Sequence, residues 1–208
     1  MRPTNIIRTI AAVALLTAPA AVSAQGRGMS RPAAPAPASD RSGYSLSLGL
    51  GGASSAFTCP GCGTSDRQNS GSGYLRLGKG FTPSVMLGVE LNGWNKTENQ
   101  VTGRTGMLSA IAQWYPSLTS GFFAKGGMGI GRTTIDDKSG VTPDKLESTG
   151  FGYQVGMGYD MSINRRWSIT PYVNYLATAG ANATLNGVNQ NQKLDANYFQ
   201  YGLGLSWH

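Results

Sequence analysis

The amino-acid sequence predicts an all-β protein: an eight-stranded, antiparallel, up-and-down transmembrane β-barrel over residues 43–208. The first observation is that apolar residues alternate with small or polar residues, as in strands that have one apolar and one polar face. The second is that short and long connections alternate along the chain, which is typical of membrane barrels. The third is composition. Glycine is 30 of 208 residues, charged residues are only 13%, and no apolar run of about 18 residues could form a spanning helix.

Two segments precede the barrel. Residues 1–24 resemble a cleaved signal peptide, because Arg2 and Arg8 precede a short apolar run and small residues end at Ala24. Residues 25–42 are rich in Pro and Ala and have little to bury, so we expect a disordered linker. The sequence leaves open whether this tail binds cell wall or serves only as a spacer.

The first four strands are expected from the position of their apolar residues. In the first, Leu46, Leu48 and Leu50 alternate with Ser and Gly, and in the second Leu75 and Leu77 alternate with larger polar residues. The third and fourth carry Val, Leu and Ala at every second position. Because alternate side chains of a strand point to opposite faces, each segment has one apolar face. The predicted ranges are 44–51, 72–80, 85–92 and 108–114.

The last four strands follow the same rule with more aromatic residues. Their apolar faces oppose faces made of Gly, Ser, Thr, Gln and Asn, which suits lipid on one side and a narrow interior on the other. The final strand has an apolar face opposite a small or polar one, and it pairs best with the first strand, because that pairing closes the barrel. The predicted ranges are 122–130, 151–159, 167–175 and 198–208.

The connections predict which side of the membrane each rim faces. Short turns are predicted at 81–84, 116–121 and 160–166, on the periplasmic side together with both chain ends. Long polar loops are predicted on the outer side. Their ranges are 52–71, 95–103, 132–149 and 178–197.

Aromatic residues near both ends of the strands predict belts at the two membrane surfaces. Core aromatics of a soluble barrel are the alternative, but the spread to both rims favours the belts. On the short-turn rim the candidates are Tyr44, Phe81, Trp114, Tyr115, Trp167 and Trp207, and on the other rim they are Trp94, Tyr175 and Tyr198.

Four polar side chains are predicted to face the interior: Arg76, Glu90, Lys125 and Gln154. Eight strands enclose a space that side chains can fill, and buried charges need partners. We therefore expect a lumen network in which Glu90 pairs with Arg76, Lys125 or both. A narrow ion path along the same charges is the alternative.

The signal peptide, the eight alternating segments and the ending at 198–208 together resemble the small OmpA/OmpX-like outer-membrane β-barrel family, the outer membrane protein beta-barrel domain. The resemblance implies the bacterial outer membrane as location and the barrel-assembly machinery as a partner. It also implies that the final strand is an assembly signal. Trp207 is penultimate here and His208 follows it, whereas the family pattern ends on an aromatic residue. The signal residues are Phe199, Tyr201, Leu203, Leu205 and Trp207.

The sequence offers few groups for catalysis. Cys59 and Cys62 have CxxC spacing, and we expect a disulfide in an outer loop rather than a redox pair or a zinc site. His208 is the single histidine and lies at the periplasmic end, a poor position for a Ser-His pair. We therefore expect no enzyme, no cofactor and no metal.

The sequence favours a non-enzymatic outer-membrane barrel that supports envelope structure or interacts through its outer loops with an unknown extracellular ligand. The expected surroundings are outer-membrane lipid and lipopolysaccharide, with the barrel as a monomer. A small pore or hydrophobic-solute conduit is the alternative, and a soluble lipocalin-like ligand-binding barrel is the second. The net charge is +7, but the basic residues are scattered singly, which argues against nucleic-acid binding.

Overall fold

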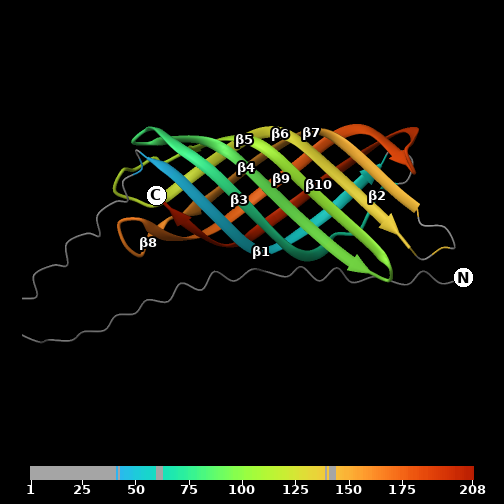
Figure 1. Ribbon diagram of the computed structural model, residues 1–208, viewed down its shortest axis with the longest axis horizontal. Coiled ribbons are helices and arrows are strands. Elements are labelled where there is room, and N and C mark those ends of the chain that lie inside the picture. Colours follow the sequence, from blue (N-terminus) through green and yellow to red (C-terminus); the bar gives the residue numbers. More distant parts are fainter. Residues whose placement is uncertain (1–40, 42, 60–62, 139, 141–143) are drawn as a thin grey trace, which may run out of the picture. The chain divides into compact units, whose positions relative to one another are not determined.

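The computed structural model describes residues 41, 43–59, 63–138, 140 and 144–208 (Figure 1). The predicted signal peptide, residues 1–24, lies outside the described residues, and so does the predicted linker, residues 25–42, except for Arg41. Both assignments remain predictions. Within the described part of the chain, no helix has the length and apolar character needed to cross a membrane.

Eight long antiparallel strands form a closed barrel, which confirms the predicted fold class. Consecutive long strands pair with one another, and β10 pairs with β1 to complete the ring. Two additional two-residue strands, β2 and β8, pair with β1 and β9. The bounds are β1 Tyr44–Cys59, β2 Gly63–Thr64, β3 Gln68–Thr82, β4 Val85–Glu98, β5 Val101–Trp114, β6 Phe122–Asp137, β7 Asp144–Tyr159, β8 Met161–Ser162, β9 Trp167–Leu185 and β10 Val188–Trp207.

The closing seam joins the first and last strands in the register that their alternation requires. Leu46 is opposite Trp207, Leu48 opposite Leu205 and Leu50 opposite Leu203. Paired residues of an antiparallel ladder share a face, so these apolar side chains all point outward.

The outer face is apolar around the barrel. Leu48 is 54% exposed, Leu108 58% and Ile130 65%. A soluble monomer rarely exposes a continuous apolar surface of this kind, whereas a spanning barrel covers it with lipid. The soluble lipocalin-like alternative therefore has no support in this structure.

The strands extend well past the membrane belt, and the prediction of long outer loops was wrong. Glu98 and Val101 are joined by Asn99 and Gln100, and Leu185 and Val188 by Asn186 and Gly187. These turn residues have φ values of 47° and 69°, and 49° and 83°. Positive φ at both central positions is the type I′ pattern, whose twist matches that of paired strands.

The ranges predicted as loops are therefore mostly hairpin arms. The region predicted as loop 132–149 is largely β6 and β7, and 52–71 is largely β1 and β3. Their polar residues do not interrupt the strands, because backbone hydrogen bonds hold a ladder together even where neither face is apolar. The short turns on the opposite rim lie where they were predicted.

Candidate functional site

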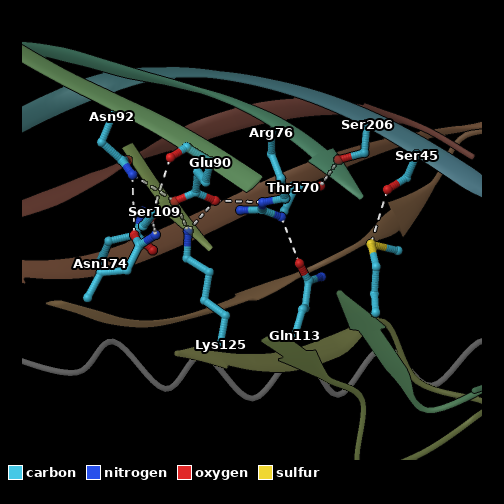
Figure 2. Close-up of polar contacts among 12 residues, drawn as sticks. Ser45, Arg76, Glu90, Asn92, Ser109, Gln113, Lys125, Thr170, Asn174 and Ser206 are labelled. Atoms are coloured by element: carbon cyan, nitrogen blue, oxygen red, sulfur yellow. Dashed lines mark hydrogen bonds and ion pairs between the residues drawn. The ribbon is translucent and has the colours of Figure 1, made fainter. Parts of the chain in front are cut away.

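The centre of the lumen is built on Glu90, which lies in β4 between two cations, one from the adjacent β3 and one from β6 (Figure 2). Arg76 of β3 is its register partner, and Arg76 Nε donates a hydrogen bond to Glu90 Oε2 at 2.6 Å. Lys125 Nζ of β6 lies 2.5 Å from Oε1 and 2.7 Å from Oε2. All three side chains are buried, so one carboxylate joins three strands across the interior.

Amides and a hydroxyl supply further hydrogen bonds around these charges. Asn92 Nδ2 donates to Glu90 Oε1 at 2.9 Å and to Gln154 Oε1 at 3.2 Å. Gln154 in turn donates to Ser109 Oγ at 2.5 Å. The structure thus brings the four predicted lumen residues into one cluster, with Gln154 connected to Glu90 through Asn92.

The central cluster has more positive than negative charge, since two cations contact one carboxylate. The ring of Tyr74 lies beside both cations, with its centroid 4.8 Å from Arg76 Cζ and 5.3 Å from Lys125 Nζ. An aromatic face attracts cations through its quadrupole. Tyr74 therefore offsets part of the excess charge without a second carboxylate.

A second polar group fills the lumen at the rim of the short turns, the rim predicted to be periplasmic. Tyr115 donates to Asp160 Oδ2 at 2.7 Å, and Thr170 donates to Asp160 Oδ1 at 2.7 Å. Gln113 links this group to the centre, because its amide nitrogen contacts Tyr115 Oη at 2.5 Å while its oxygen accepts from Arg76 at 2.9 Å.

Arg41 also belongs to this end of the barrel, although the sequence places it in the predicted disordered linker. It is buried, its guanidinium lies 3.9 Å from the ring centroid of Tyr115, and it donates to the Ser120 carbonyl at 2.8 Å. The linker itself stays a prediction, but Arg41 near its end contacts the barrel, because an arginine can place its apolar stem along a ring while its charged head finds acceptors.

An apolar layer fills the lumen on the outer side of the charged centre. It consists of Ala53, Trp94, Met107, Leu176 and Tyr198, with Phe57 packed against it. Trp94 is 3% exposed and Tyr198 0%, so assigning them to the outer aromatic belt was wrong. Strand alternation predicts their inward direction, because Trp94 lies four residues after Glu90 and Tyr198 lies two residues before the inward Gln200.

Of the aromatic residues predicted for the short-turn rim, Tyr115 is 1% exposed and lies in the lumen, so assigning it to the belt was wrong. The others lie on the outer face. Tyr44 is 69% exposed and Trp114 54%, and Trp167 and Trp207 face each other across the β9–β10 ladder. Phe199, Tyr201, Leu203 and Leu205 of the last strand are also exposed. Their roles in the membrane interface and in assembly remain predictions.

The remaining predicted groups do not form a reactive site among the described residues. β1 ends at Cys59, and Cys62 lies outside the described residues, so the disulfide remains a prediction. No group of three or more His, Cys, Asp or Glu side chains is placed to hold a metal ion in the described ranges. At the chain end, the backbone nitrogen of His208 donates to the Arg166 carbonyl at 2.9 Å, and burial lowers the pKa of the imidazole.

Solved structures with a similar fold are small outer-membrane barrels. Ail, the attachment invasion locus protein of Yersinia pestis, has 11% sequence identity and a TM-score of 0.52, covering 78% of this chain and 99% of that chain. Neisserial surface protein A has 14% identity and a TM-score of 0.49, covering 80% and 97%. OprG from Pseudomonas aeruginosa has 17% identity and a TM-score of 0.48, covering 81% and 98%. At these identities the likeness to Ail shows the fold alone.

No curated protein matches the chain. A family model does match, and it spans residues 9–207, nearly the whole sequence. This match agrees with the closed ring, the apolar outer face and the polar interior described above. The chain therefore belongs to the outer membrane protein beta-barrel domain family and is located in the bacterial outer membrane.

Proposed function

We propose that this protein is a non-enzymatic outer-membrane barrel with a sealed lumen, which supports the envelope and interacts with the outside through its protruding hairpins. The observation that carries the proposal is the contact of Glu90 with both Arg76 and Lys125 at the centre of the barrel. An ion path needs charged groups that are open to water, whereas these are buried and paired with one another.

The groups on either side of this centre support the same conclusion. Tyr115, Asp160 and Arg41 occupy the periplasmic end, and Trp94 and Tyr198 occupy the outer half. A solute crossing the lumen would have to displace a polar group, a buried ion cluster and an apolar layer in turn. The pore or conduit alternative therefore requires a rearranged lumen.

Conductance in planar lipid bilayers tests the sealed lumen. The refolded full chain should show no steady single-channel current. Arg76→Ala/Glu90→Ala/Lys125→Ala removes the central cluster without leaving an unpaired charge, and it should conduct or show frequent openings. Steady conductance by the unaltered protein, at a level that this triple variant leaves unchanged, would show that ions bypass the cluster and would overturn the proposal.

The surface interaction is proposed from the two-residue turns that extend β4–β5 and β9–β10 beyond the apolar belt. Deleting residues 182–185 and 188–193 shortens the β9–β10 hairpin and keeps its Asn186–Gly187 turn between the paired Ala181 and Leu194. Bacteria with the shortened protein should adhere less to host cells or surfaces at equal barrel levels. Equal adhesion after shortening this hairpin and the β4–β5 hairpin would contradict the role.

We also propose lipopolysaccharide and the barrel-assembly machinery as partners. The outward Phe199, Tyr201 and Trp207 of the last strand support the second, because they form a lipid-facing row at the chain end. Trp207→Ala should lower the fraction of chain that reaches the SDS-resistant barrel form in cells. An unchanged fraction would argue against recognition of this residue.

A further inference from the structure

The outer wall of the barrel has a shallow groove on its extracellular half, across β4, β5 and β6. Its volume is about 350 Å³. Leu91, Leu108 and Ile130 form its apolar part, and two arginines border it on the side of the hairpin tips. Residues that line the groove include Leu91, Arg104, Gly106, Leu108, Ile130 and Arg132.

The two arginines are neighbours on the outer face. Arg104 is opposite Thr134 and Gly106 is opposite Arg132 in the β5–β6 ladder, so Arg104 and Arg132 are diagonal to each other. Both side chains are exposed. Diagonal neighbours on one face of a ladder are within reach of each other when their side chains are long.

The charges around the groove leave one cation unbalanced. Arg132 and Lys145 share Glu147, at 2.8 Å and 2.6 Å, and Asp136 is the register partner of Lys145. Arg104 makes no hydrogen bond or ion pair with any residue that the structure describes. Three cations against two carboxylates make this patch attractive to an anion, and Arg104 is the group free to bind it.

The level of the two arginines relative to the membrane indicates where the bound anion would come from. Leu91, Leu108 and Ile130, which are 51%, 58% and 65% exposed, belong to the lipid-covered belt immediately below. An arginine facing lipid is costly at the bilayer midplane but costs little near the interface. The side chains therefore suit the level of the outer-leaflet headgroups, where phosphates are the available anions.

The outer wall above the apolar belt carries glycines at two facing positions where strand packing would allow a side chain. Gly93 and Gly106 are register partners in β4 and β5. A Cβ on Gly93 would meet no atom within 4 Å, and one on Gly106 would meet only the Asn92 carbonyl oxygen, at 3.7 Å. By contrast, a Cβ on Gly129 would overlap the Leu108 backbone. Gly106 lines the groove and Gly93 lies beside it, so the wall here is open to an occupant rather than filled by a neighbouring strand.

We propose that this groove binds the phosphorylated lipid A part of lipopolysaccharide. Arg104, with Arg132, holds a phosphate through charge-assisted hydrogen bonds, and an acyl chain lies along Leu91, Leu108 and Ile130. This site specifies how the proposed partner lipopolysaccharide is bound, so it rests on that part of the proposed function. It depends on the hairpins facing outward, and it is independent of whether the lumen conducts.

The test compares lipid A binding by the folded full chain and by variants. Arg104→Gln/Arg132→Gln removes the two charges, and Gly106→Leu fills the groove without changing charge. Arg165→Gln/Arg166→Gln is the matched control, because it removes the same charge from the periplasmic rim. Refolding of every variant is checked by its band shift on unboiled SDS gels. Native mass spectrometry then measures retention of lipid A, with phosphatidylglycerol as competitor.

Lipid A binding should weaken about tenfold in the double arginine variant, which is the loss of roughly one charge-assisted hydrogen-bonded pair. Gly106→Leu should also weaken binding about tenfold, because its side chain occupies the groove and excludes the lipid. The control should bind as the unaltered protein does. Equal binding by the groove variants, or displacement of lipid A by an equal amount of phosphatidylglycerol, would overturn the site. Conductance of the same proteins is measured separately, so a conducting barrel that still binds lipid A would refute only the sealed lumen.

Discussion

Replacing Glu90 by Gln should destabilise the barrel more than any other single change in the central cluster. Glu90 lies 2.6 Å from Arg76 and 2.5 Å from Lys125, and all three side chains are buried. At an effective dielectric constant of about 20, each contact corresponds to an attraction of about 6 kcal/mol. The neutral amide loses both and leaves two cations facing each other. Relaxation and water entry reduce the net loss to about 3–5 kcal/mol.

Lys125→Met provides the comparison, because it removes one cation and leaves Arg76 paired with Glu90. Replacing a buried charge by an apolar side chain of similar length costs little when no charge is left unpaired, so we expect a loss below about 2 kcal/mol. Glu98→Gln is the exposed control, because this carboxylate is 61% exposed and pairs only with Lys96 among the described residues, and it should have no measurable effect.

The free energy of unfolding is measured by denaturant titration of the refolded barrel in lipid vesicles, followed by tryptophan fluorescence and by the SDS gel shift. The expected order of loss is Glu90→Gln, then Lys125→Met, then the exposed control. The reasoning is refuted if Lys125→Met costs as much as Glu90→Gln, since the carboxylate would then not be the shared partner of two cations.

Three further predictions concern the wall, the lumen and the chain end. A variant that keeps only Trp94 should resist quenching by brominated lipid chains, whereas one that keeps only Trp114 should be quenched; equal quenching would contradict the inward position of Trp94. Gly127→Ala should cost about 1–3 kcal/mol, because a Cβ there meets the Ala110 carbonyl oxygen at 2.6 Å, whereas Gly93→Ala should stay within about 0.5 kcal/mol; equal denaturation midpoints would reject this difference. Burial lowers the pKa of His208, so the unfolded chain takes up the proton first and stability should fall as the pH drops below about 6.5. His208→Asn should reduce this dependence, and an unchanged pH profile would exclude His208 as its source.

The alternation of side chains was enough to predict the barrel and its central charges. Glu90 and Arg76 lie on the polar face of their strands, and an eight-stranded interior forces such charges together. The same alternation places Trp94 and Tyr198 inside, whereas their position near a rim alone suggests the outer belt, so the face of the strand is the better predictor. Tyr115 and Asp160 also lie on inward positions, just past strand ends, where the expected turns obscured the pattern.

The outer hairpins could not be predicted from apolar periodicity, because that signal ends where the lipid ends. The Asn186–Gly187 pair is a recognised hairpin signal and would have indicated β9 and β10 as continuous arms. The Asn99–Gln100 pair is a weaker hairpin signal. Arg41 carries no local signal, because its position depends on the Tyr115 ring and the Ser120 carbonyl, which are distant in sequence.

The seam between β1 and β10 has a consequence for the order of folding. Its contacts join the two ends of the barrel sequence, so no intermediate that lacks the last strand can satisfy the backbone groups on the edge of β1 that faces β10. Contacts between residues so far apart in the chain are slow to form, because the chain must lose much of its freedom before they stabilise it. A chain cut before β10 would therefore expose two reactive edges instead of forming a smaller barrel. Such a chain would depend on periplasmic chaperones, or be degraded, for as long as its edges stayed open.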